Sequence, residues 1–335
     1  MSAKQIVALL SSHVEGNEEL FLSIALQVAA QAARSGSKQD AETLRGLVQK
    51  ARERRSEKVR TGPTPIPLAR PKGELQGLVE SAYPNTRFSN MVLSDDVAGR
   101  LERVLLEQRE RAVLRDHGQR PATHILLAGP PGTGKTMTAA ALAGELRLPL
   151  FTVRLDALFS RFLGETASKL RLVFDQAAET RGVYLLDEFD ALGARRGDPN
   201  DVGEIRRVLN SVLSFMEEPN VTDSLVVAAT NHVGMLDEAL ARRFDEVIEY
   251  ELPNAEAARL VLEQRLGKFR LSAGDWKRLG GAYEGLSQAE LVRSADSVVK
   301  ASILAGDVKI AAGHLKAALD ERLRVRQRFS NRVVT

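Results

Sequence analysis

The chain has 335 residues and a formal net charge of +3, with 44% hydrophobic and 27% charged residues, which is typical of a globular protein with a substantial core. It contains no cysteine, which excludes disulfides, thiolate metal sites and cysteine nucleophiles. The most apolar stretch, Leu20 to Ala33, is interrupted by polar residues and is too short to span a bilayer. We therefore expect no membrane association, and a cytoplasmic location because no oxidising compartment is needed.

Residues 1–60 are expected to form a small helical bundle. Apolar residues recur there at helical spacing, for example Leu20, Ile24 and Val28, and glycine and serine residues separate the helical stretches. We expect this bundle to recruit a partner or substrate.

Residues 61–87 are expected to be a linker and the approach to the core. The segment from Thr61 to Pro71 carries four prolines, and such a segment is extended and cannot continue a helix. Residues 72–90 have an ambiguous pattern. The proline-rich segment therefore separates the N-terminal bundle from the rest of the chain.

The remaining sequence predicts an α/β domain over residues 88–252 and an all-helical domain over residues 253–335. In the first, short apolar runs alternate with helical stretches, which indicates a parallel sheet covered by helices on both faces. The second has helical spacing without strand signals. The predicted strands are His124–Ala128, Leu150–Val153, Val183–Leu186, Leu225–Ala229 and Val247–Tyr250.

The strongest motif is a phosphate-binding loop that follows the predicted strand His124–Ala128 and opens a predicted helix, Met137–Leu146. Its glycines let backbone N–H groups surround phosphates, Lys135 reaches the β- and γ-phosphates, and the Thr136 hydroxyl is a ligand for Mg²⁺. The motif comprises Gly129, Pro130, Pro131, Gly132, Thr133, Gly134, Lys135 and Thr136. These residues predict a P-loop NTPase that uses ATP and Mg²⁺.

A second motif is the apolar run Val183–Leu186 followed by Asp187 and Glu188. Ligands of parallel sheets lie at the carboxyl ends of the strands, which is where these two carboxylates are expected. Asp187 is predicted to organise Mg²⁺, and Glu188 to orient and deprotonate the attacking water. Such a pair commonly just marks the end of a strand, but its position after the phosphate loop supports the functional interpretation.

With both motifs in this order, the stretch from about Phe88 to Ser297 resembles an AAA+ ATPase, in the branch that includes katanin, spastin and the proteasomal ATPases. The resemblance covers more than half of the chain. It implies further site residues beyond the phosphate loop and the carboxylate pair.

The resemblance implies that Asn231 helps to hold the attacking water, and that Arg242 and Arg243 are arginine fingers for a neighbouring subunit's ATP. Without the resemblance, Asn231 would be an asparagine that ends a buried strand and caps the next turn, and the arginine pair would be a solvated face at a helix end. The family often places an arginine in the helical lid, where this chain has Ala289. We therefore expect the backbone near Ala289 to line the adenine site, beside a capping box formed by Ser287 and Glu290.

The segment around Phe162, Leu163 and Gly164 resembles the first pore loop of the family, which grips a polypeptide in the channel of a ring. Phenylalanine stands where the family often has tyrosine or tryptophan, and the alternative is a core phenylalanine at a helix end. The resemblance implies a homo-oligomer, expected to be a hexamer, that remodels, unfolds or threads protein substrates.

Two other functions remain open on the sequence. A nucleic-acid motor or loader is slightly supported by the arginines between residues 322 and 332, although no nucleic-acid-binding signature accompanies them. An accessory ATPase that serves a separately encoded enzyme, such as a protease, would share the same mechanism. The polymer that stimulates hydrolysis distinguishes a protein motor from a nucleic-acid motor.

Overall fold

The computed structural model describes residues 71, 73–158, 163–192, 201–232, 241–307 and 309–333, together with the isolated residue 46. The chain divides into two compact units, Met1–Leu68 and Ala69–Thr335, and the second is described below. The predicted N-terminal bundle and the proline-rich segment lie almost entirely outside the described residues, so both stay predictions.

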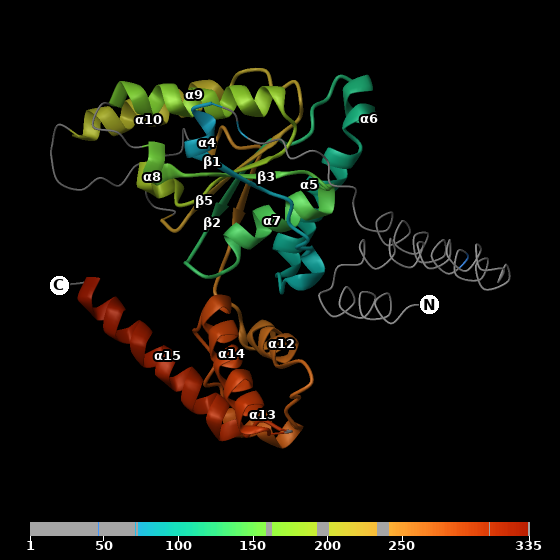
Figure 1. Cartoon of the computed structure of the whole chain (residues 1–335), viewed down its shortest axis with the longest axis vertical. Helices are drawn as coiled ribbons and strands as arrows, with labels where there is room; N and C mark the ends of the chain where they lie inside the picture. Colours follow the sequence, from blue (N-terminus) through green and yellow to red (C-terminus); the bar gives the residue numbers. More distant parts are fainter. Residues whose placement is uncertain are drawn as a thin grey trace, which may run out of the picture. The chain divides into compact units, whose positions relative to one another are not determined.

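A six-stranded sheet in the order β1-β3-β4-β5-β2-β6 forms the centre of the second unit (Figure 1). Every neighbouring pair is parallel except β1 with β3, which is antiparallel. The strands are β1 (Val79–Ala82), β2 (His124–Ala128), β3 (Leu150–Val153), β4 (Val183–Leu186), β5 (Leu225–Thr230) and β6 (Glu246–Glu249). The expected fold class, a mostly parallel sheet with flanking helices, is confirmed.

Sequence reasoning missed strand β1, which lies in the segment assigned to the linker and the approach to the core. Its sequence, Val-Glu-Ser-Ala, has a single large apolar residue, and its burial alternates because it is an edge strand. Strands β2, β3 and β4 have the predicted bounds, β5 is one residue longer, and β6 begins and ends one residue earlier.

Helices cover both faces of the sheet. Adjacent residues of a strand point to opposite faces, so one strand contributes side chains to two cores. On β2, Leu126 belongs to a core with α9 (Leu163–Glu179) and α10 (Asp201–Met216). Ile125 and Leu127 belong to a second core with the helices of the other face. Those helices are α5 (Asp95–Arg109) and α7 (Lys135–Leu146). The strands buried on both faces read as continuous apolar runs for this reason.

The described residues of the α/β part also form several shorter elements. Two of these elements are 3₁₀ turns, η1 (Phe88–Asn90) and η2 (Phe189–Leu192). The short helices are α4 (Leu75–Leu78), α6 (Arg111–Asp116) and α8 (Leu155–Leu158).

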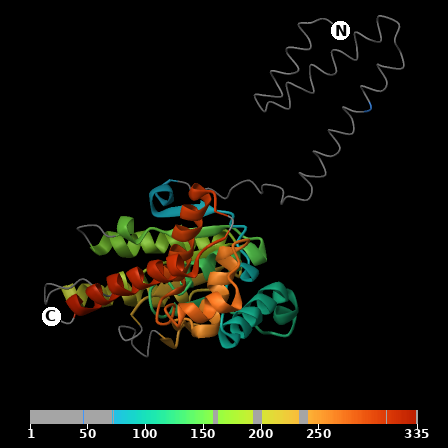
Figure 2. The same cartoon turned by 90° about the horizontal axis from the view of Figure 1, so that it is seen from below.

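The helical region after β6 has a core of its own, which includes Leu262, Trp276, Leu291 and Leu315. The helix starts are fixed by side chains that accept a hydrogen bond from the first turn, at Asn254, Ser272 and Ser287. Figures 1 and 2 show these helices gathered together, with α15 running out toward the C-terminal end. They are α12 (Ala255–Leu266), α13 (Ala273–Leu279), α14 (Gln288–Ala305) and α15 (Ala312–Val333).

Within the described residues, none of the helices is both long enough and apolar enough to cross a bilayer.

Candidate functional site

The phosphate loop leaves β2 and enters α7 in a conformation that requires glycine. Gly129 has a φ of +143°, and a Cβ atom placed there would lie 2.2 Å from the backbone oxygen of Tyr250. Gly134, with a φ of +105°, turns the chain into the helix. The loop starts beside the end of β5, where the Gly129 N–H donates to the Thr230 carbonyl at 3.2 Å. Backbone N–H groups at a helix start of this kind attract anions.

Lys135 is buried against the loop that precedes it. Its ammonium group donates to the carbonyl oxygens of Gly129 at 2.7 Å and Pro130 at 2.8 Å. Burial lowers the pKa of Lys135, and the nearby charges of Asp187 and Asp190 partly oppose that shift. The loop itself is stiffened by Thr133, whose hydroxyl donates to the Pro130 carbonyl at 2.8 Å.

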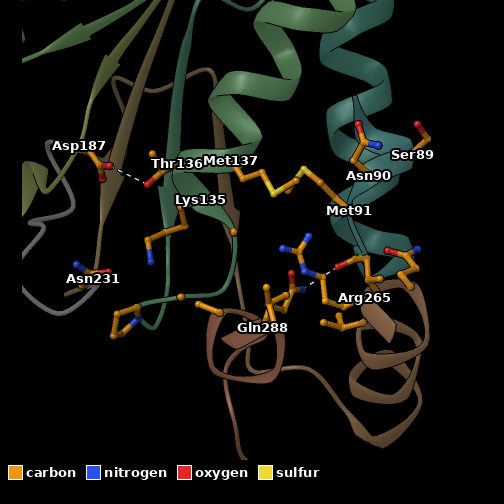
Figure 3. Close-up of a pocket in the computed structure, with 18 of the residues that line it drawn as sticks. Ser89, Asn90, Met91, Lys135, Thr136, Met137, Asp187, Asn231, Arg265 and Gln288 are labelled. Carbon is orange, nitrogen blue, oxygen red and sulfur yellow. Dashed lines mark hydrogen bonds between the residues drawn. The ribbon is translucent and has the colours of Figure 1, made fainter. Parts of the chain in front are cut away.

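The two motifs predicted from the sequence meet at the carboxyl ends of β2 and β4. The Thr136 hydroxyl donates to Asp187 Oδ2 at 2.7 Å, as Figure 3 shows. A hydroxyl and a carboxylate side by side are hard oxygen donors, and Mg²⁺ takes one or two such protein ligands together with substrate phosphates. The residues therefore fit the predicted Mg²⁺ site.

Glu188 follows Asp187 in a left-handed backbone conformation, with a φ of +51°. Its N–H donates to Asp187 Oδ1 at 2.9 Å, and its side chain is exposed. This conformation costs about 1 kcal/mol in a residue with a Cβ atom, and such costs are concentrated at functional sites. The turn carries the chain from β4 into the 3₁₀ turn η2.

Asp190 connects this turn to the end of β5, a contact that sequence reasoning missed. Its Oδ1 atom accepts hydrogen bonds from the Thr230 hydroxyl at 3.0 Å and from the Asn231 N–H at 3.2 Å. The backbone of Asn231 is thus fixed by a carboxylate from the neighbouring strand's turn. The sequence feature that could have revealed this contact is the spacing of three residues between Asp187 and Asp190. A 3₁₀ turn has three residues per turn, so η2 returns Asp190 to the edge of the site.

These residues border a cavity of about 970 Å³ between the loop and the helical region (Figure 3). The predicted residues that line it are Pro131, Gly132, Gly134, Lys135, Thr136, Asp187, Glu188, Asn231 and Ala289. Of the remaining loop residues, Gly129, Pro130 and Thr133 form the frame of the loop behind the lining. The cavity volume lies at the upper end of the range for small-ligand pockets.

The helical region and the segment before α5 supply a wall that the sequence predicted only in part. Gln288, which follows the predicted capping box residue, donates through Nε2 to the Val92 carbonyl at 2.8 Å and so joins α14 to that segment. Arg265 of α12 also lines the cavity, with its guanidinium bound to Asp296. Met91, the residue before Val92, also lines the cavity and is labelled in Figure 3. The capping box of Ser287 and Glu290 is confirmed.

Arg242 and Arg243 lie apart from this cavity. They precede β6 at the amino end of the sheet, where Asp245 Oδ2 accepts hydrogen bonds from the N–H groups of Thr123 and His124 at 2.8 and 2.9 Å. Arg243 forms an ion pair with Glu217 at 2.7 Å. The phosphate loop is at the opposite end of β2, which has five residues, so about 16 Å of strand separates the two edges.

The predicted pore loop lies largely outside the described residues. Phe162 is not described, whereas Leu163 and Gly164 form the first turn of α9. The role of these three residues stays a prediction.

A mostly parallel sheet with a glycine-rich phosphate loop between its first parallel strand and the following helix defines a P-loop nucleoside triphosphatase. The model of the ATPase family associated with various cellular activities, AAA, matches residues 125–252. The chain belongs to the AAA family of ATPases, so it binds nucleotide and hydrolyses ATP.

Relatives support this assignment. An uncharacterized AAA family ATPase of Sinorhizobium fredii, y4kL, is 33% identical over 311 residues, which are 93% of each chain. The ATP-dependent zinc metalloprotease FtsH 3 of Sphaerobacter thermophilus is 32% identical over 74% of this chain and 52% of its own length. A putative 26S proteasome regulatory subunit homolog of Methanothermobacter thermautotrophicus is 36% identical over 42% of this chain and 38% of its own.

Proposed function

We propose that this ATPase works as a ring, in which each ATP is bound by one subunit and completed by an arginine of the next, and that the ring remodels, unfolds or threads proteins. The observation that carries the ring is the separation of Arg242 and Arg243 from the phosphate loop of their own chain. An arginine finger must touch the transferred phosphoryl group. Because about 16 Å of strand lies between the two edges, these arginines suit a neighbour's ATP.

The site residues have separate roles in this proposal. Lys135 and the loop N–H groups bind the β- and γ-phosphates, and Ala289 lies at the adenine side of the cavity. Thr136 and Asp187 would hold Mg²⁺, which would neutralise charge on the phosphates. Asn231 positions the attacking water, and its own backbone is held by Asp190.

Glu188 is the proposed general base. Its exposed carboxylate stands at the cavity edge beside the Mg²⁺ residues, so it can accept a proton from a water that attacks the γ-phosphate. Arg242 or Arg243 of the neighbouring subunit would stabilise the charge that develops on the transferred group. Hydrolysis then depends on the subunit interface, which couples chemistry to movement between subunits.

Protein as the substrate is supported by the names of the relatives, which include an ATP-dependent metalloprotease and a proteasome regulatory subunit homolog. The chain spans about half or less of those proteins, so their activities enter only as part of this proposal. We propose that Phe162, Leu163 and Gly164 grip the polypeptide, that residues 1–60 recruit it, and that the ring is hexameric and cytoplasmic.

Mixing two inactive variants tests the ring. Glu188→Gln removes the base, and Arg243→Ala removes one of the two proposed fingers. In a mixed ring, an Arg243→Ala subunit keeps its own base and receives an intact arginine from a Glu188→Gln neighbour. About a quarter of the interfaces in an equal mixture are then complete, and we expect ATPase activity to reappear in about that proportion. Arg242→Ala is mixed in the same way to decide between the two arginines.

The absence of recovery with both arginine variants would refute a shared site. The substrate is tested separately, by adding a permanently unfolded protein or single-stranded DNA to the wild-type enzyme. We expect the protein to raise ATP turnover. Stimulation by DNA that disappears as salt rises would instead support a nucleic-acid motor.

A further inference from the structure

The turn that precedes α14 lies between the phosphate loop and the C-terminal helix α15. On one side, the Ala289 N–H donates to the Gly132 carbonyl at 3.0 Å. On the other side, Arg326 of α15 donates through Nη1 to the Gly285 carbonyl. A single turn of backbone therefore separates the loop that surrounds phosphates from a guanidinium of the last described helix.

The contact with the phosphate loop is close. A Cβ atom on Gly132 would lie 2.8 Å from Ser287 Oγ and 3.0 Å from the Ala289 Cβ, and Gly132 has a φ of +78°. A side chain at position 132 would push the turn away from the loop. The position of Ser287 and Ala289 thus determines how the wall of the cavity meets the phosphate loop.

One carboxylate oxygen organises the turn from within. Glu290 Oε2 accepts hydrogen bonds from the Ser287 N–H and from the Ser287 hydroxyl, both at 2.7 Å. Arg326 Nη1 lies 3.7 Å from the same oxygen. The side chains of Arg326 and Glu290 are 35% and 24% exposed, so the charge that Arg326 supplies is only partly screened by solvent.

We propose that Arg326 is a positioning residue for ATP binding, which holds the start of α14 against the phosphate loop through Gly285 and Glu290. The inference rests on the proposed placement of the nucleotide in the cavity lined by Gly132 and Ala289. Arg326 reaches the turn at two points, a carbonyl at its beginning and a carboxylate at its end. Without these contacts the turn must be ordered when ATP binds, and that cost weakens binding.

The position of α15 would then be linked to nucleotide affinity. A partner that moved or covered this helix would change the contact between Ala289 and Gly132 without touching the nucleotide. By reciprocity, ATP would stabilise the docked position of α15.

Arg326→Met tests the role, because it removes the guanidinium and keeps an apolar stem of similar length. Arg324→Met is the matched control, since Arg324 is exposed on the same helix and donates within it, to the Asp320 carbonyl at 3.3 Å. We expect Arg326→Met to weaken binding of a fluorescent ATP analogue about five- to twentyfold and to raise KM for ATP, with kcat changed by less than about threefold. Arg324→Met should stay within about twofold, and Arg326→Lys, which keeps the charge and a donor, should recover part of the affinity.

Amide hydrogen exchange over residues 285–291 provides the second readout. It should be faster in Arg326→Met than in the wild type or Arg324→Met, because the turn opens more often. If Arg326→Met loses helical content, Arg326→Lys is used in its place to test the role of Arg326, with the same two measurements and the same controls.

Unchanged ATP affinity and unchanged exchange in a folded Arg326→Met protein would overturn the inference. The proposed site itself is checked in parallel with Lys135→Ala. If Lys135→Ala binds the analogue normally, the placement of the nucleotide fails. If Lys135→Ala loses binding while Arg326→Met does not, only the role of Arg326 is refuted.

Discussion

Arg243 Nη2 lies 2.7 Å from Glu217 Oε1, an ion pair between the residue proposed to reach a neighbouring subunit and the residue just after α10. The two side chains are 36% and 60% exposed, and pairs at this exposure contribute about 0–1 kcal/mol to stability. A phosphate group is a stronger acceptor for a guanidinium than one exposed carboxylate. The pair can therefore be exchanged for a contact with ATP at a subunit interface.

Arg243→Ala is expected to lower kcat at least about a hundredfold while leaving the free energy of unfolding within about 0.5 kcal/mol of the wild type. Glu217→Gln should leave both unchanged or raise kcat, because it releases Arg243. ATP turnover and urea unfolding measure the two quantities. A loss of kcat in Glu217→Gln as large as that in Arg243→Ala would mean that Glu217 itself positions the arginine.

Thr136→Ala should raise the Mg²⁺ concentration needed for half-maximal ATPase activity about tenfold, because it removes the hydroxyl that faces Asp187 at 2.7 Å. Thr136→Ser keeps a hydroxyl and is expected to behave nearly as the wild type. Mg²⁺ titrations at saturating ATP provide the comparison. Equal Mg²⁺ dependence in Thr136→Ala and Thr136→Ser would exclude the hydroxyl as a ligand.

Glu188→Gln should bind ATP within about threefold of the wild-type affinity and hydrolyse it at least about a hundredfold more slowly. The amide has the shape of the carboxylate but does not accept a proton from water. Binding of the analogue and single-turnover hydrolysis separate the two effects. Glu179→Gln, at the end of α9, is the control for the loss of one negative charge. Turnover retained in Glu188→Gln would remove Glu188 as the base.

Asp190→Ala should lower kcat about tenfold with little change in KM, which corresponds to about one net hydrogen bond that holds the Asn231 backbone. Asp190→Asn keeps an oxygen acceptor for Thr230 and Asn231 and should retain most of the activity. Steady-state kinetics of the two variants make the test. An equal loss of kcat in both variants would mean that the charge of Asp190, rather than its oxygen as a hydrogen-bond acceptor, is required.

The pKa of Asp245 lies below its usual value: burial opposes ionisation, but hydrogen bonds from His124 and Thr123 outweigh it. A lowered pKa in the folded state stabilises the fold above the unfolded-state pKa of about 4, and the contribution is lost as pH falls through the folded value. Asp245→Asn should therefore cost about 1 kcal/mol at pH 7 and flatten the decline of stability below about pH 4. Urea unfolding between pH 7 and pH 3 checks this; an unchanged pH dependence would contradict it.

Local patterns were sufficient for much of the fold and of the nucleotide site. Strands β2 and β4 are buried along their whole length, and in β3 only Thr152 is partly exposed, so each is a short and mostly apolar run with clear ends. The loop from Gly129 to Thr136 needs its glycines for local reasons, because its backbone adopts positive φ angles. The carboxylates Asp187 and Glu188 follow a strand directly, so their place at the sheet edge follows from the strand.

The sequence by itself thus determined the class of fold, the phosphate loop and the order of the motifs. Only the tertiary structure decided the contacts between segments far apart in the chain. It gave β1 its antiparallel place, since a short edge strand with a single large apolar residue has no distinctive sequence pattern. It brought Asp190 to Asn231, Arg243 to Glu217 and Arg326 to Glu290. Such pairs depend on which strands and helices become neighbours, and a single sequence carries no periodic signal for that choice.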